Sequence, residues 1–93
     1  MREKTREFTD FPRHYKVIIY NDDFTPMDFV VQLLIDVFLK PRSEAVAIML
    51  AVHEQGQMVV GLYGLDMAVS MVRRATDMAR AEGYPLRLAY EPE

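Results

Sequence analysis

The sequence predicts a small α+β domain in which three helices pack on one face of a mostly antiparallel, three-stranded sheet. Two short segments show the alternation of a strand, a third is rich in β-formers, and three longer segments show apolar residues at helical spacing. Glycine or proline separates most of these segments. The resulting order is β-α-α-β-α-β, which is typical of helices packed on one side of an antiparallel sheet.

The first strand is predicted over residues 15–20, where Tyr15, Val17 and Ile19 lie on one face and the second face is also fairly apolar. The preceding residues 1–13 carry mixed charges and Pro12, which favours a flexible arm. We therefore expect the folded domain to span residues 14–93.

The first helix is predicted over residues 26–39. Thr25 is expected to cap it, Pro26 suits the first helical position, and Asp28 stands where a capping-box carboxylate would reach back. Its apolar residues recur at helical spacing, so that one face packs inward: Phe29, Val30, Leu33, Leu34, Val37 and Phe38.

The second helix is predicted to form a hairpin with the first. Pro41 ends the first helix, Ser43 is expected to cap the second, and Glu44 lies favourably in its positive first turn. This helix is predicted to run to Gln55, with Gly56 as its stop.

The remaining elements complete the sheet and its cover. A second strand is predicted over residues 57–63, and a third helix over residues 65–82, ended by Gly83. The apolar stripe of that helix is Ala68, Val72, Ala75 and Ala79. The last strand alternates through Leu86, Leu88 and Tyr90.

Composition limits the possible functions. The 93 residues suffice for one soluble domain, with 51% hydrophobic and 27% charged residues. A net charge of −3 argues against nucleic acid as a partner, and the absence of cysteine excludes disulfides and Cys-based zinc sites. With no apolar run long enough for a membrane span and no signal-peptide core at the start, we expect a cytoplasmic protein without a membrane partner. Nothing in the sequence demands more than a monomer.

The corner between the first strand and the first helix is the main candidate site. Asn21, Asp22 and Asp23 are held there between two fixed elements, and their oxygen atoms can bind a ligand. The alternative is that this run is only turn chemistry, because Asn and Asp hydrogen-bond their own backbone.

His53 extends this candidate site. It shares one face of the second helix with Met49 and Val52, a position that also fits a core or interface histidine. Together with Asn21 and Asp23, a neutral imidazole nitrogen would offer three acceptors to a group with three donors. The natural candidate is an ammonium, such as a free α-amino group.

The methionines are mostly at spacings that fit the core, where methionine commonly fills gaps. Met27 is the exception, because it occupies the first helical turn beside the polar corner. Its adaptable side chain could wall a pocket for a large apolar group.

The segments YKVIIYNDDFTPMDFV, MLAVHEQG and GYPL resemble the ClpS family of adaptor proteins, from Tyr15 to Tyr90. The resemblance implies a non-catalytic adaptor without a cofactor. It would bind proteins that begin with Phe, Tyr, Trp or Leu, the N-degrons of the N-end rule. It would then deliver them to a Clp-type, ClpA-like AAA+ unfoldase that works with the ClpP protease.

The resemblance also implies residue roles. Asn21 and His53 match residues that hydrogen-bond the α-amino group of the substrate; Asp23 assists through water, and Asp22 contributes through backbone and charge. The matching lining of the first-side-chain pocket is Ile19, Thr25, Met27, Val30, Met49, Val52 and Leu86. Met27 matches the gatekeeper that rejects β-branched Val and Ile.

Two departures concern delivery rather than binding. The arm before Tyr15 is short, whereas this segment helps delivery in the family. Asp66 keeps an acidic position of the unfoldase-docking face, but Met71 stands where family members can carry a basic residue.

Two other classes of function stay open. An enzyme or metal site would use Asp22, Asp23 and His53, but His14 lies at the arm junction and no Ser or Cys nucleophile stands in a recognisable elbow. A non-catalytic interaction domain, similar to a ribosomal-stalk C-terminal domain, would bind partners through a helical face and ignore free N-termini.

Overall fold

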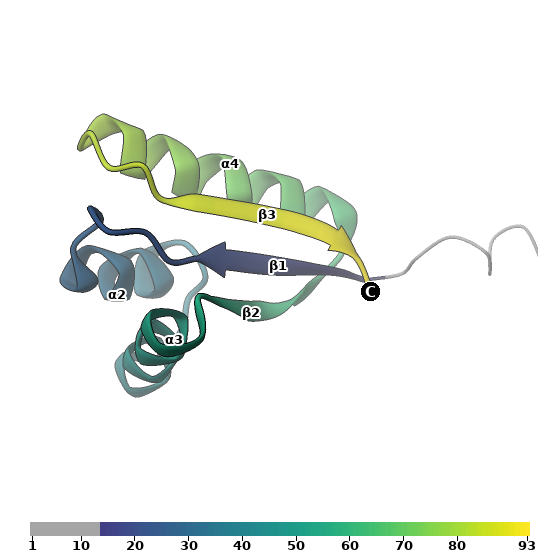
Figure 1. Cartoon of the computed structure of the whole chain (residues 1–93). Helices are drawn as coiled ribbons and strands as arrows, with labels where there is room; N and C mark the ends of the chain where they lie inside the picture. The colour runs from purple at the N-terminus through teal and green to yellow at the C-terminus, as the bar shows by residue number, and fades with distance from the viewer. Residues whose placement is uncertain (1–13) are drawn as a thin grey trace, which may run out of the picture.

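The computed structural model describes residues 14–93, and the expected flexible arm at residues 1–13 lies outside them. The elements are β1 (Tyr15–Tyr20), α2 (Met27–Asp36), α3 (Arg42–Gln55), β2 (Gln57–Tyr63), α4 (Leu65–Ala81) and β3 (Arg87–Pro92). The predicted class and element order are therefore confirmed (Figure 1). Within the described residues, no helix is both long enough and apolar enough to cross a membrane.

The sheet has the order β2-β1-β3, with β1 in the centre and antiparallel to both neighbours. At the end of β1, Tyr20 lies opposite Gln57 of β2 and Arg87 of β3. The end of the first strand thus adjoins the start of the other two. Three connections therefore meet at this end of the sheet: the corner after β1, the turn between α3 and β2, and the segment before β3. This end is on the left in Figure 1.

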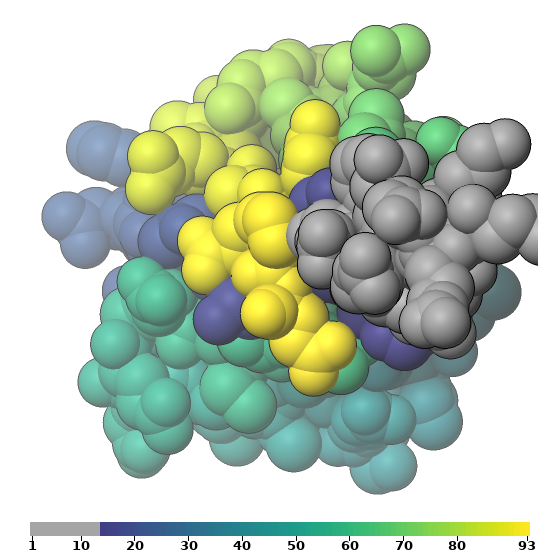
Figure 2. Space-filling model, turned by 90° about the vertical axis from the view of Figure 1, so that its right-hand side faces the viewer, coloured from purple at the N-terminus to yellow at the C-terminus, as the bar shows by residue number. Residues whose placement is uncertain are grey.

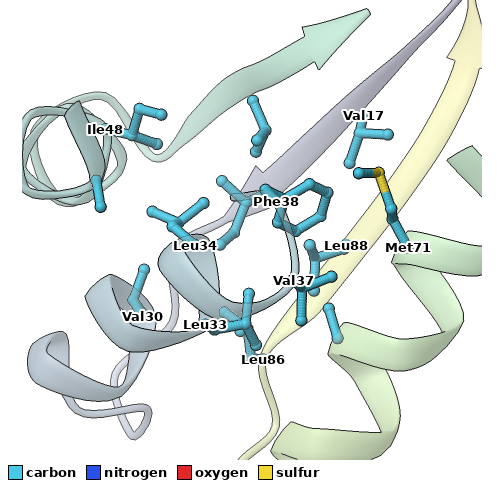
Figure 3. Packing of buried hydrophobic residues seen from close by; sticks show 14 of the residues in the cluster. Val17, Val30, Leu33, Leu34, Val37, Phe38, Ile48, Met71, Leu86 and Leu88 are labelled. Atoms are coloured by element: carbon cyan, nitrogen blue, oxygen red, sulfur yellow. The ribbon is translucent and has the colours of Figure 1, made fainter. Parts of the chain in front are cut away.

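The core lies between the sheet and the helices, which cover one face of the sheet as predicted (Figure 1). Val17 and Ile19 of β1 are fully buried in it, together with Leu33 and Leu34 of α2. Figure 3 shows side chains of α2, the turn after it, α4 and β3 converging on this layer. The buried apolar side chains therefore fix the helices behind the end of the sheet where the three connections meet.

The opposite end of the sheet carries the end of the described chain. Figure 2 faces this end, where β3, in yellow, lies between α4 in green above and teal segments below. His14 and Glu93 meet there through a backbone hydrogen bond of 3.1 Å and a side-chain contact of 3.7 Å between Nδ1 and Oε1. This end is therefore distinct from the candidate site.

Both predicted serine and threonine caps are wrong. Pro26 and Pro41 are the N-caps of α2 and α3, with extended backbones and no side-chain cap bond. Proline takes the required φ without strain, so the helices begin one residue after it. Ser43 lies inside α3, and Thr25 lies before the cap and bonds Asp22 instead. The capping box of Asp28 is also absent, because the Thr25 N–H donates to Asp22.

The C-terminal ends differ between the helices. α2 ends at Asp36, earlier than predicted, and Leu39 adopts a left-handed backbone with φ of 56°. Helical backbone is disfavoured at Lys40 because it precedes Pro41, so the chain turns there. Gly56 and Gly83 follow α3 and α4 with φ of 90° and 79°, the conformation that makes glycine a helix stop.

Met71, named above for its departure from the family pattern, belongs to the core. It is 9% exposed and shares the buried stripe of α4 with Ala68, Ala75 and Ala79, whereas Val72 is only half-buried. Figure 3 shows its side chain directed toward Val17 of β1. Helical spacing turns Met71 toward the sheet, and the expected effect of this position on unfoldase docking stays a prediction.

Candidate functional site

Asp22 organises the corner after β1. Its Oδ1 accepts hydrogen bonds of 2.8 Å from the backbone N–H groups of Phe24 and Thr25, and its Oδ2 accepts one of 2.8 Å from the Thr25 hydroxyl. This is the turn chemistry expected of aspartate. Because both carboxylate oxygens are used, Asp22 shapes the loop, while the neighbouring side chains of Asn21 and Asp23 are exposed.

The ionisation of Asp22 follows from these contacts. Burial of the carboxylate raises its pKa, but the hydrogen bonds from Phe24 and Thr25 and the positive charge of Arg80 together outweigh this effect. The pKa of Asp22 is therefore below the ordinary value of 3.8. The corner thus carries a fixed negative charge at neutral pH.

The corner is tied to the end of α3. The backbone N–H of Asn21 donates a hydrogen bond of 2.9 Å to the carbonyl oxygen of Gly56, whose own N–H donates to Val52 at 2.8 Å. His53 lies in the last turn of α3 and is exposed. The structure therefore brings the segment of Asn21 beside the helix end that carries His53, and the exposure of His53 excludes a core histidine.

The predicted pocket residues divide into two groups. Ile19, Val30, Val52 and Leu86 are at most 7% exposed and belong to one apolar cluster. Thr25 and Met49 are half-buried, and Met27 is 44% exposed. The first group therefore belongs to the core, whereas the second provides side chains that reach the surface.

A surface groove beside the start of α2 has a volume of about 650 Å³. Its lining consists of Met27, Asp28, Phe29, Val31, Gln32, Arg42, Met49 and Tyr84. Met27 and Met49 were predicted as pocket residues, whereas the buried members of the predicted lining do not border this groove. Of the predicted pocket residues, only these two methionines therefore line this groove.

Several supporting contacts were not predicted. The ring of Tyr84 meets that of Phe29 edge to face at a centroid distance of 4.9 Å, and the Arg80 side chain donates to two carbonyl groups before β3. The guanidinium of Arg87 lies 4.3 Å from the ring centre of Tyr20. An Arg in the last turn of a helix commonly bonds nearby carbonyls, and this was the available signal for Arg80.

Asp66, the predicted docking residue, is exposed in the first turn of α4. It stands between Leu65 and Met67, which are 45% and 55% exposed. Between residues 14 and 93, no group of three or more His, Asp or Glu side chains is arranged to hold a metal ion.

Comparisons with known proteins agree with this geometry. The model of the family "ATP-dependent Clp protease adaptor protein ClpS" matches residues 10–89. The ClpS adapter protein of Deinococcus radiodurans is 49% identical, over 99% of this chain and 83% of its own. That of Oleidesulfovibrio alaskensis is 50% identical, over 86% of this chain and 77% of its own.

A solved structure is similar throughout the described fold. Agrobacterium tumefaciens ClpS2 bound to L-phenylalaninamide aligns with a TM-score of 0.85 and 36% identity, covering 89% of this chain and 100% of that one. Fold, sequence and family model thus lead to the same assignment. The chain belongs to the ClpS family, the adaptor proteins of the ATP-dependent Clp protease.

Proposed function

We propose that this chain binds the free N-terminal residue of protein substrates, selects Phe, Tyr, Trp or Leu, and delivers them to a ClpA-like AAA+ unfoldase with ClpP. The Asn21–Gly56 hydrogen bond carries this proposal, because it brings the polar corner to the end of α3 that holds His53. The related ClpS2 binds L-phenylalaninamide, which has a free α-amino group and an aromatic side chain. The chain acts as a carrier, without a catalytic step, a cofactor or a metal.

The α-amino group is bound by acceptors around the corner. An ammonium has three donors, which match the amide oxygen of Asn21, a neutral nitrogen of His53, and the carboxylate of Asp23 reached through water. Asp22 contributes indirectly, because its carboxylate already orders the loop and adds negative charge. A blocked N-terminus offers neither the charge nor all three donors.

The first side chain enters an apolar pocket. Its base is formed by Ile19, Val30, Val52 and Leu86, and Thr25, Met27 and Met49 border its entrance. Burial of a Leu or aromatic side chain is worth roughly 1.5 to 3 kcal/mol, and each hydrogen bond to a charged group about as much. After the cost of association, this leaves an affinity on the order of micromolar, which allows release of the cargo.

Met27 acts as the gatekeeper. Its side chain is 44% exposed at the start of α2 and lines the surface groove together with Met49. A β-branched side chain is widest next to the backbone, where Met27 would meet it, and is also stiff at χ1. We therefore infer that Val and Ile are rejected while Leu is accepted.

Delivery requires contact with the unfoldase, for which we propose the exposed first turn of α4 around Asp66. The exposed apolar side chains of Leu65 and Met67 flank this carboxylate and suit a protein partner. The adaptor would act as a monomer in the cytoplasm.

The experiment is degradation of a fluorescent reporter by a ClpA-like unfoldase with ClpP, with and without this chain. A reporter that begins with Phe should be degraded faster when the chain is added, whereas a reporter that begins with Val should not. The variant Asp66→Lys should bind an N-terminal Phe peptide normally but lose the stimulation. Equal effects of the chain on both reporters would contradict the proposed selection.

A further inference from the structure

We propose that Arg80 is a positioning residue of the first-side-chain pocket: its guanidinium fixes the segment of residues 84–86 and thereby the place of Leu86. This inference rests on the proposed function and adds a residue to that site. Arg80 lies in the last turn of α4 and does not belong to the predicted lining.

The contact is a fork on two carbonyl groups. Nη1 of Arg80 donates hydrogen bonds of 2.8 Å to the carbonyl oxygens of Tyr84 and of Leu86. One nitrogen of a guanidinium carries two N–H groups, so it can serve both acceptors at once. Because the donor is charged, these bonds are stronger than neutral ones.

Apart from its apolar packing, the segment has few other hydrogen bonds to described residues. It lies between the end of α4 and the start of β3, and Pro85 within it has no N–H to donate. Its N-terminal end is held by the turn at Gly83, where the Tyr84 N–H donates to Ala79 at 2.9 Å and the Gly83 N–H to Arg80 at 3.0 Å. The side chain of Arg80 extends this hold to Leu86.

The fixed segment supports two parts of the site. Leu86 is 1% exposed and belongs to the apolar base. Tyr84 packs edge to face on Phe29 of α2, two residues after Met27, and lines the same groove as Met27 and Met49. A shift of this segment would therefore change both the depth of the pocket and the support of its entrance.

Electrostatics connect Arg80 to the polar corner as well. Its positive charge is one of the causes that lower the pKa of Asp22, after the hydrogen bonds from Phe24 and Thr25. The same guanidinium thus acts on the loop after β1 and on the segment before β3. The amine acceptors themselves receive no described hydrogen bond from it, so it should affect the side-chain pocket more than amine recognition.

The test compares Arg80→Lys with the wild-type chain by anisotropy with peptides that begin with Phe, Leu or acetyl-Phe. Lysine keeps the charge but is a flexible, strongly hydrated point charge without the planar fork. We expect the Phe peptide to bind about tenfold more weakly and the ratio of the Phe to the Leu dissociation constant to change at least about threefold. Acetyl-Phe should be rejected by both proteins.

Two controls separate positioning from general stability. Arg73→Lys changes another exposed arginine of α4, one that makes no hydrogen bond or ion pair to a described residue. It should leave the affinity for the Phe peptide and the Phe-to-Leu ratio unchanged. Phe38→Leu weakens the core beside Tyr63, at the other end of the sheet, and should lower stability without changing the Phe-to-Leu ratio.

The outcomes distinguish this inference from its premise. If the wild-type chain ignores the Phe peptide, the proposed function fails and the role of Arg80 fails with it. If the wild type binds and folded Arg80→Lys keeps both dissociation constants, only the role of Arg80 is overturned. The role of Arg80 would likewise be overturned if Arg80→Lys and Phe38→Leu changed the Phe-to-Leu ratio of dissociation constants equally, because lower stability alone would then explain the effect.

Discussion

The backbone N–H of Asn21 donates a hydrogen bond of 2.9 Å to the carbonyl oxygen of Gly56. This bond continues the pairing of β1 with β2, in which Tyr20 lies opposite Gln57, by one further residue. It joins the loop of the polar corner to the residue that ends α3. Two segments far apart in sequence therefore form one surface.

Removal of the His53 imidazole should weaken binding without destabilising the fold. In His53→Ala, the ammonium of an N-terminal Phe peptide loses one acceptor, and we expect at least tenfold weaker binding by anisotropy. Because His53 is exposed, the free energy of unfolding should change by less than about 0.5 kcal/mol. Gln55→Ala, also exposed in the same helical turn, is the matched control and should bind normally. Unchanged affinity in His53→Ala would remove His53 from the site.

Truncation of Met27 should relax the selection against β-branched residues. In Met27→Ala, we expect a peptide with N-terminal Val to bind within about threefold of one with N-terminal Leu, because the entrance is wider. Met67→Ala shortens a methionine of similar exposure on α4 and should still reject Val. If Val is rejected equally by both variants, the gate lies elsewhere.

Asp22→Asn should lower stability in a manner that depends on pH. The pKa of Asp22 in the folded state is below its unfolded value near 3.8. Ionised Asp22 therefore contributes to folding stability above that unfolded value, and this contribution is lost as the pH falls through the folded pKa. Since Asn cannot accept all the hydrogen bonds of the carboxylate, we expect a loss of about 1 kcal/mol at pH 7 in urea unfolding.

Asp23→Asn provides the matched comparison for that experiment. Asp23 is exposed and makes no hydrogen bond within the described residues, so its change should leave stability at pH 7 nearly unaltered. The difference in the free energy of unfolding between Asp22→Asn and the wild type should become smaller in acid. A difference that stayed constant down to pH 2 would contradict the claim that the ionised carboxylate of Asp22 stabilises the fold.

Gly56→Ala should destabilise the junction between α3 and β2 through the backbone alone. Gly56 has φ of 90°, and an added Cβ would meet no atom within 4 Å, so only the strained conformation opposes alanine. We expect a cost of about 1 kcal/mol in urea unfolding. Gly64→Ala also meets no atom but lies at φ of −62°, and should be nearly neutral. Equal stability losses in the two variants would contradict this reasoning.

The order of elements could be predicted because its signals are local. Gly56 and Gly83 end helices through a conformation that few other residues adopt, and Pro41 separates α2 from α3. Alternation in β1 and helical spacing in α4 similarly depend on near neighbours. The wrongly predicted cap of α2 also has a local cause. The Thr25 hydroxyl donates to Asp22, and Pro26 is the N-cap.

The site could be predicted only in part. Asn21 and His53 are related by the register of β1 against β2, which spacing alone does not fix. Their combination was inferred from the match of acceptors to an ammonium and from the resemblance to a family. The fork of Arg80 on Tyr84 and Leu86 depends on how the chain turns after α4. The last-turn position of Arg80 signals only that it bonds nearby carbonyls, so the proposed positioning role could be inferred only from the structure.

The central claim is that this chain reads a free N-terminal residue. Its most direct test is fluorescence anisotropy with four labelled peptides that differ only at the N-terminus: Phe, Leu, Val and acetyl-Phe. We predict that Phe and Leu bind with dissociation constants on the order of micromolar, and that Val and acetyl-Phe bind far more weakly. Equal binding of Phe and acetyl-Phe would contradict the amine site around Asn21 and His53.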